Sequence, residues 1–298
     1  MSKLLSEEIL EKKWQEATIK RDVIFTKVFG ENKKLTLELL QIILPKLKIE
    51  EIIDIIPEDR EKENIVYRGV RFDVYVKDEN SRMYDIEMQV VNHHDLGKRI
   101  AYYQNKLSSK ALKPSQKFFE KNDTFVIFVC DFDYFQLGLP VYHTTMRLKE
   151  DLNKIVDTGE HNVILNSRAK DFSSVSPEVK AFLEYVRENK VSNEFTKDLD
   201  REVKKIKSST EVRDSFMTWE EKLAEERYYA GKEAEEKGME KGMEKGIEKG
   251  KREMVVNAIK NQKKLGNSRQ NIINSVADFL SIDKEEVAKY YDEEMVVK

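Results

Sequence analysis

Residues 71–91 read RFDVYVKDENSRMYDIEMQVV, and this stretch decides the fold. Apolar side chains occupy every second position on both sides of a polar segment, with Val74 before it and Ile86 and Met88 after it. This period of two is typical of β-strands that bury one face. The polar segment, KDENS at residues 77–81, has the composition of a turn. The stretch therefore predicts a β-hairpin with one apolar and one polar face.

The polar face of this hairpin carries candidate metal ligands. Asp73 on the first strand and Glu87 and Gln89 on the second share that face, provided that the turn keeps the apolar faces together. Hard cations such as Mg²⁺ bind to carboxylate oxygens, and a cation held there would activate water and stabilise charge on a phosphodiester. The alternative is an ordinary solvated strand face, because Asp85 lies on it too, without an evident purpose.

The segments around the hairpin alternate between helix and strand patterns. Helical periodicity covers residues 20–44, with a break near residues 30–32. The next predicted elements are a strand at 51–56 ended by Pro57, the hairpin strands at 64–76 and 82–91, a helix at 96–113 ended near Pro114, and a buried strand at 124–130. This order, αβββαβ, predicts an α/β core. Residues 143–165 are expected to complete it, and residues 177–185 and 198–206 to be helical.

The C-terminal part of the chain differs in composition. Residues 236–251 read EKGMEKGMEKGIEKGK, a four-residue repeat. Each glycine costs a helix about 1 kcal/mol relative to alanine, more than a Glu/Lys pair returns. The repeat is therefore expected to be either a helix with a partner along its Gly-Met stripe or a flexible arm. Residues 255–291 have the pattern of a small helical hairpin, whose acidic second half favours protein contact over DNA reading.

These patterns divide the chain into four predicted parts. They are an α/β core at residues 1–170, a helical segment at 171–218, a charged repeat at 219–253 and a helical hairpin at 254–298.

Composition limits the classes of function. Among 298 residues, 53 Lys and Arg oppose 56 Asp and Glu, giving a net charge of −3, so any nucleic-acid contact must come from a local patch. The single cysteine, Cys130, excludes a disulfide within the chain. The first residues lack the apolar segment of a signal peptide, and no apolar run is long enough to span a membrane. These features predict a cytoplasmic protein without a membrane partner.

A local basic patch does follow the hairpin. The helix predicted at residues 96–113 carries a set of side chains suited to a phosphate backbone: Lys98, Arg99, Tyr102, Lys106 and Lys110. The alternative is a solvated cationic helix face, since lysine is common on protein surfaces.

The ordered combination of these motifs resembles the Rpn family of recombination-promoting nucleases and transposases, a branch of the PD-(D/E)XK nuclease superfamily. The resembling segments are DVIFTKVFG at 22–30, RFDV at 71–74, DIEMQ at 85–89, Arg99 with Tyr102 and Tyr103, and the Glu-Lys-Gly tail up to about residue 253. The resemblance implies a restriction-endonuclease-like α/β/α core with a helical C-terminal extension. It also implies Mg²⁺-dependent DNA cleavage, with Mn²⁺ as a substitute, and a link to recombination or mobile DNA.

The resemblance also implies roles for individual residues. Asp73 and Glu87 match the metal-binding acids, and Gln89 stands where the superfamily usually has lysine. A glutamine cannot supply positive charge or act as a base, so its amide would orient water or phosphate. Asp22 is either a further acid near the metal or a charge that suits the start of a helix.

Two classes of function follow. The first is a Mg²⁺-dependent DNA endonuclease in which Asp73, Glu87, Gln89 and Asp22 form the site. The second is a catalytically silent DNA-binding or assembly protein derived from a transposase-like nuclease. In either case the repeat is a candidate element for homo-oligomerisation.

Overall fold

The computed structural model describes residues 5–60, 71–113 and 115–296. The chain forms two compact units that divide between Glu221 and Lys222. The first unit contains the predicted hairpin and the candidate site.

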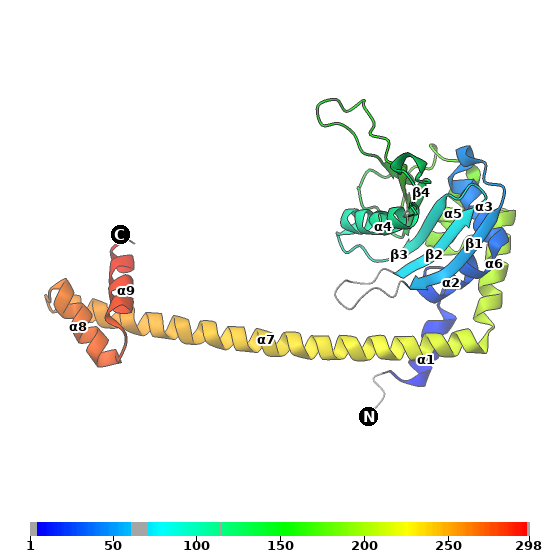
Figure 1. Cartoon of the computed structure of the whole chain (residues 1–298). Helices are drawn as coiled ribbons and strands as arrows, with labels where there is room; N and C mark the ends of the chain where they lie inside the picture. Colours follow the sequence, from blue (N-terminus) through cyan, green and yellow to red (C-terminus); the bar gives the residue numbers. More distant parts are fainter. Residues whose placement is uncertain (1–4, 61–70, 114, 297–298) are drawn as a thin grey trace. The chain divides into compact units, whose positions relative to one another are not determined.

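The centre of the first unit is a sheet of six strands within the described residues, in the order β1-β2-β3-β4-β6-β5 (Figure 1). The strands are β1 (Ile52–Arg60), β2 (Arg71–Asp78), β3 (Met83–Gln89), β4 (Thr124–Cys130), β5 (Val141–Thr144) and β6 (Glu160–Asn166). Strands β1, β2 and β3 are antiparallel, β3, β4 and β6 are parallel, and β5 is antiparallel to β6. The predicted hairpin therefore leads into a parallel sheet, as an α/β core requires.

Helices cover both faces of this sheet (Figure 1). They are α1 (Glu7–Gln15), α2 (Asp22–Glu31), α3 (Lys33–Ile43), α4 (Leu96–Lys110), α5 (Pro177–Glu188) and α6 (Glu194–Lys207), with short 3₁₀ turns at Pro45–Leu47 and Phe118–Glu120. Val74 and Ile86 share one apolar core with α1, α2, α3, α5 and α6, whereas Tyr75 and Val126 share the other with α4. The three layers confirm the predicted α/β/α class with its αβββαβ order.

Element boundaries differ from the sequence prediction where backbone context decides them. Strand β1 does not end at Pro57 but continues to Arg60. It is an edge strand, and an edge strand tolerates the missing amide hydrogen of proline. The prediction of a strand over 64–76 is met from Arg71 onward, since residues 64–70 lie outside the described part. Helix α4 ends at Lys110, three residues before the predicted end.

Other expected elements are present. The break near residues 30–32 is real, and Asn32 caps α3 by accepting a hydrogen bond from the Leu35 amide at 3.2 Å. The mixed segment at 143–165 forms β5 and β6, which complete the sheet.

The hairpin register keeps the two apolar faces together. Val74 lies opposite Ile86, and Tyr75 lies opposite Asp85. The second face is not solvated, however: Asp85, Glu87 and Gln89 are all buried beneath the α4 layer. The solvated-face alternative is thus wrong for this hairpin, because a helix follows the second strand and covers it.

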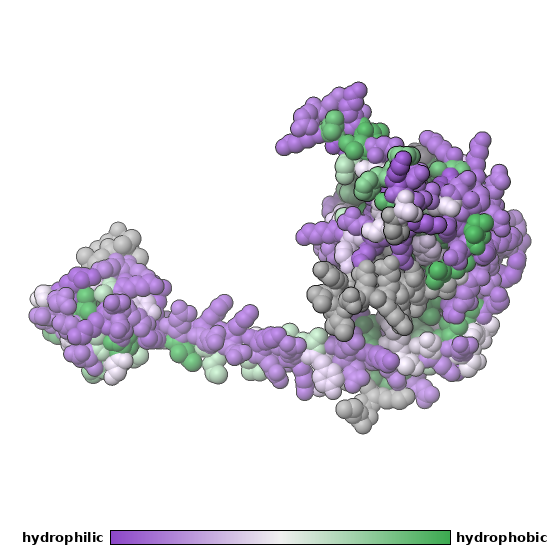
Figure 2. All heavy atoms as spheres, in the orientation of Figure 1, coloured by the Kyte–Doolittle hydropathy of each residue, from purple (hydrophilic) through white to green (hydrophobic). Residues whose placement is uncertain are grey.

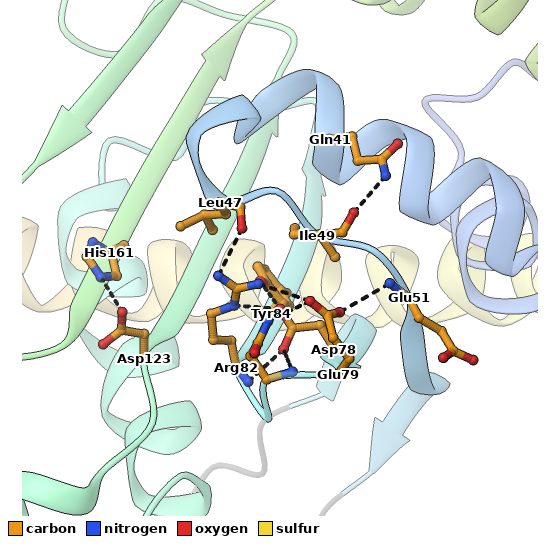
Figure 3. Close-up of polar contacts among 11 residues, drawn as sticks. Gln41, Leu47, Ile49, Glu51, Asp78, Glu79, Arg82, Tyr84, Asp123 and His161 are labelled. Carbon is orange, nitrogen blue, oxygen red and sulfur yellow. Dashed lines mark hydrogen bonds and ion pairs between the residues drawn. The ribbon is translucent and has the colours of Figure 1, made fainter.

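A buried polar network closes the turn end of the hairpin (Figure 3). The Asp78 carboxylate accepts hydrogen bonds from Arg82 Nε at 2.6 Å and from the Tyr84 hydroxyl at 2.7 Å. It also accepts hydrogen bonds from the backbone amides of Asn80 and Arg82. These bonds anchor β2 to β3 at the opposite end from Asp73 and Glu87.

The repeat is helical throughout and belongs to α7 (Thr210–Lys264). Residues 225–250 of this helix are all exposed, and Figure 2 shows mostly hydrophilic side chains along it. Helices α8 (Arg269–Leu280) and α9 (Lys284–Val296) pack with the end of α7 around Ile259, Ile273 and Val287. In the described ranges, no helix combines the length and apolar character needed to cross a membrane.

Candidate active site

Asp73 and Glu87 lie side by side on adjacent strands of the hairpin. The backbone amide of Asp73 donates to Glu87 Oε1 at 2.9 Å, and the amide of Met88 donates to Asp73 Oδ2 at 3.1 Å. Each carboxylate is thus held by the backbone of the other strand. The side-chain parity predicted from the sequence does bring these two acids together.

A pocket of about 580 Å³ opens at this point of the sheet. All four predicted catalytic residues line it, and so does one predicted DNA-binding residue: Asp22, Asp73, Glu87, Gln89 and Arg99. Asp22 reaches the pocket as the first residue of α2, where a negative charge also suits the positive end of the helix dipole. The two roles considered for Asp22 are therefore compatible.

Two neighbouring acids of β3 are strongly desolvated: Glu87, which lines the pocket, and Asp85, which is fully buried and does not line it. Burial, followed by the nearby charge of Asp73, raises the pKa of Asp85 well above its usual range. Burial and the charge of Asp85 likewise raise the pKa of Glu87. Among the described residues, neither carboxylate oxygen of Asp85 has a hydrogen-bond donor. The carboxyls of Asp85 and Glu87 can satisfy each other only by sharing a proton.

Arg99 on α4 lies close to these two acids. Its Nη2 lies 3.8 Å from Glu87 Oε2 and donates to the Tyr103 hydroxyl at 3.3 Å. Its Nη1 donates a short hydrogen bond to Gln89 Oε1. The guanidinium also lies over the rings of Tyr103 and Phe128, at 5.5 and 5.6 Å from their centroids. The guanidinium is therefore fixed in place at the pocket wall.

The remaining predicted DNA-binding residues lie elsewhere on α4. Lys98 and Tyr102 are exposed, whereas Lys106 and Lys110 are half-buried. Lys110 Nζ lies 5.3 Å from the centroid of the Tyr75 ring, over the sheet. None of these four lines the described pocket. The predicted basic stripe thus divides into a solvent-facing part and a part that faces the sheet.

Three further residues lie in or beside the pocket, and sequence reasoning did not assign them to the site: Lys20 and Tyr103 line it, and Asp85 is buried next to Glu87. Asp85 shares the strand face of Glu87, a signal that parity already contained. Tyr103 stands four residues after Arg99, so one helix face presents both. Lys20 lines the pocket from the segment before α2. No sequence pattern identifies Lys20, because its position depends on packing across the sheet.

The donor set suits a hard divalent cation. In the part of the chain that is described, no group of three or more His, Cys, Asp and Glu side chains is arranged to hold a metal by itself. Mg²⁺ needs no such cage, because it is usually bound by one or two carboxylates together with waters and phosphate oxygens. Asp73 and Glu87 supply two carboxylates, and the buried oxygens of the neighbouring Asp85 have no hydrogen-bond donor within the described ranges. The residues present therefore fit such an ion.

A comparison with known families agrees with this geometry. The sequence profile described as PD-(D/E)XK nuclease family transposase matches residues 19–167, half of the 298-residue chain. The chain belongs to this family. Its matched part runs from the segment before α2 to the end of β6 and contains every pocket acid named above.

Family membership supports a nuclease or transposase-like function and implies DNA as the substrate. PD-(D/E)XK nucleases typically use divalent metals, in agreement with the paired carboxylates. The match ends at residue 167. The resemblance of the Glu-Lys-Gly tail to the Rpn family therefore stays a prediction. Searches of curated proteins and of solved structures gave no match.

Proposed function

We propose that this chain is a Mg²⁺-dependent DNA endonuclease, with Mn²⁺ as a substitute, that acts in recombination or on mobile DNA. The family supports the coarser statement, a PD-(D/E)XK nuclease. One observation carries the finer one: the paired carboxylates of Asp73 and Glu87 at the floor of a pocket that also holds a fixed arginine. Glu87 is buried and Asp73 is half-buried. Adjacent carboxylates that are partly shielded from water weaken a fold unless a proton or a cation compensates their charge, so this pair supports a cation site.

In this proposal, Asp73 and Glu87 hold the cation, which supplies an activated water and stabilises charge on the phosphate when bound. Hydrolysis joins the oxygen of one water to phosphorus and breaks the bond from phosphorus to a sugar oxygen. One proton of that water ends on the leaving sugar oxygen and the other in solvent. Asp22 supplies a further acid at the pocket.

The solvent-facing side of α4 is proposed to bind the DNA backbone. Lys98 and Tyr102 are exposed there, and Lys106 and Lys110 are half-buried on the same helix. Phosphate contacts of this kind position DNA without reading its sequence. The proposal therefore includes no sequence preference.

The test is cleavage of supercoiled plasmid with Mg²⁺ or Mn²⁺ by the full chain and by Asp73→Ala. Asp54→Ala is the matched control, because Asp54 is an exposed acid of the same sheet outside the pocket. We expect nicking by the wild type and by Asp54→Ala, and its loss with Asp73→Ala or with EDTA.

Two results would contradict the enzyme. Nicking that persists in Asp73→Ala and in EDTA would show a contaminating nuclease. DNA binding without any nicking would favour the alternative of a catalytically silent DNA-binding protein.

A further inference from the structure

Phosphodiester cleavage builds up negative charge on the phosphate oxygens, and a fixed positive side chain can stabilise this charge together with a metal ion. Three lysine and arginine side chains line the described pocket: Lys20, Arg21 and Arg99. Their surroundings differ, and the difference decides which of them is available to a substrate.

Lys20 and Arg21 each pair with a buried carboxylate that also binds a second cation. Lys20 Nζ lies 2.9 Å from Asp131 Oδ2 and also donates to the Arg187 carbonyl at 3.1 Å. Arg21 Nη1 lies 3.3 Å from Glu220 Oε1. Both acids are almost fully buried, and each has another partner: Arg168 Nε lies 2.8 Å from Asp131 Oδ1, and Lys13 Nζ lies 2.6 Å from Glu220 Oε2. Lys20 and Arg21 are therefore bound in ion-pair networks with acids other than Asp73 and Glu87.

Arg99 is held differently. Its closest side-chain acceptor is the neutral amide oxygen of Gln89, and its acidic neighbour Glu87 lies at the longer distance of 3.8 Å. A neutral acceptor fixes a guanidinium without cancelling its charge. Of its five N–H donors, one is directed to Gln89 and one to Tyr103, which leaves donors for a bidentate contact with phosphate.

Gln89, for its part, is engaged at both ends. Its Oε1 accepts from Arg99, and its Nε2 donates to the Val91 carbonyl at 2.7 Å. The second bond fixes which end of the amide faces Arg99. Its geometry therefore suits holding the arginine better than the water-orienting role expected from the sequence.

We propose that Arg99 is the catalytic cation that contacts the phosphate under attack, and that Gln89 is a positioning residue that holds it. This inference rests on the proposed endonuclease function. It assigns Arg99 a role in the reaction, whereas the sequence analysis placed it among the residues that bind the DNA backbone.

The test compares the effects of substitutions on kcat and on KM, measured by single-turnover and steady-state plasmid cleavage. Arg99→Ala should lower kcat by about 10²–10³-fold, as loss of one preorganised charge-stabilising donor does elsewhere. DNA affinity measured by fluorescence anisotropy in Ca²⁺, without turnover, should change far less. Lys98→Ala, on the exposed side of the same helix, should instead weaken binding and leave kcat nearly intact. Asn105→Ala, also exposed on α4, is the matched control and should change neither.

Two further variants guard against a purely structural role. Arg99→Lys keeps the charge but not the planar fork, so we expect a loss in kcat smaller than that of Arg99→Ala. Gln89→Lys combined with Arg99→Ala returns a cation to the same wall of the pocket and should recover part of the lost kcat. Thermal unfolding followed by tryptophan fluorescence checks that each variant is folded.

The outcomes are distinguishable. If the wild type cleaves and folded Arg99→Ala cleaves equally fast, only this inference is overturned. If Arg99→Ala loses affinity instead of kcat, Arg99 grips the backbone and the inference is also overturned. If the wild type cleaves nothing, the proposed function fails and takes this inference with it.

Discussion

Replacing Asp78 by alanine should destabilise the first unit more than loss of any exposed ion pair. Asp78 is fully buried and accepts hydrogen bonds from the Tyr84 hydroxyl and from Arg82 Nε (Figure 3). Tyr84 is itself fully buried, so its hydroxyl would lose this hydrogen-bond acceptor in the interior. The same change would leave the guanidinium of Arg82, whose side chain is 15% exposed, without its buried counter-charge.

Breaking a buried pair from one side costs about 3–5 kcal/mol. Arg82 keeps the Leu47 carbonyl at 3.3 Å and Glu79 at 3.5 Å, which places the loss near the lower end, at about 3 kcal/mol. For a unit of this size, each kcal/mol lowers the midpoint of thermal unfolding by about 2–4 °C. Asp78→Ala should therefore lower that midpoint by roughly 6–12 °C.

The assay is unfolding followed by tryptophan fluorescence. Both tryptophans, Trp14 and Trp219, lie in the first unit, so the signal does not include the second. Asp123→Ala is the matched control, because Asp123 pairs with His161 at 3.5 Å and both side chains are nearly half exposed (Figure 3). An exposed pair contributes about 0–1 kcal/mol. If Asp78→Ala lowers the midpoint no more than Asp123→Ala does, the buried network does not hold the hairpin.

Two further predictions concern other parts of the chain. Burial alone would raise the pKa of Asp131, but hydrogen bonds from Arg168, Lys20 and Ser167 outweigh it and hold that pKa below its usual range. Its contribution to stability is therefore present above about pH 4 and lost at lower pH. In Asp131→Asn, the free energy of urea unfolding should decrease less steeply as the pH falls below about 4. An equally steep decrease in the wild type and the variant would refute this. In α7, an added Cβ would meet nothing within 4 Å among the described residues at each repeat glycine: Gly238, Gly242, Gly246 and Gly250. Replacing all four by alanine should strengthen the helix by about 0.5–1 kcal/mol per site in circular-dichroism melts. Light scattering on the same variant tests the predicted self-association, which should weaken if it depends on close approach at the glycines.

The hairpin and the order of the elements around it could be predicted from the sequence, because both depend on local patterns of apolar and polar residues. Apolar and polar residues alternate along residues 71–91, and this two-residue period determines which side chains share a face of the strand. The end of β1 was not predictable in this way. Proline usually ends a strand, and only the position of β1 at the edge of the sheet lets Pro57 be included.

The candidate site was predictable only as far as strand parity reaches. Parity placed Asp73, Glu87 and Gln89 on one face, but it could not tell whether that face meets water. The burial of Asp85 depends on α4 packing over the hairpin, a contact between elements that no local pattern encodes. Charge counting along α4 likewise could not separate Lys98, which faces solvent, from Arg99, which faces the acids.

The charges of α4 act on the fold and on the site together. Arg99 and Lys110 both favour the ionised form of the buried Asp85, so the cations near the sheet offset repulsion among its acids. The same guanidinium of Arg99 faces the pocket where a phosphate would bind. A carboxylate at position 89 would cancel its charge, and a lysine would repel it. The neutral amide of Gln89 leaves the charge of Arg99 available both to the buried acids and to the pocket. Gln89→Lys combined with Arg99→Ala is therefore expected to restore part of the cleavage rate that Arg99→Ala alone removes.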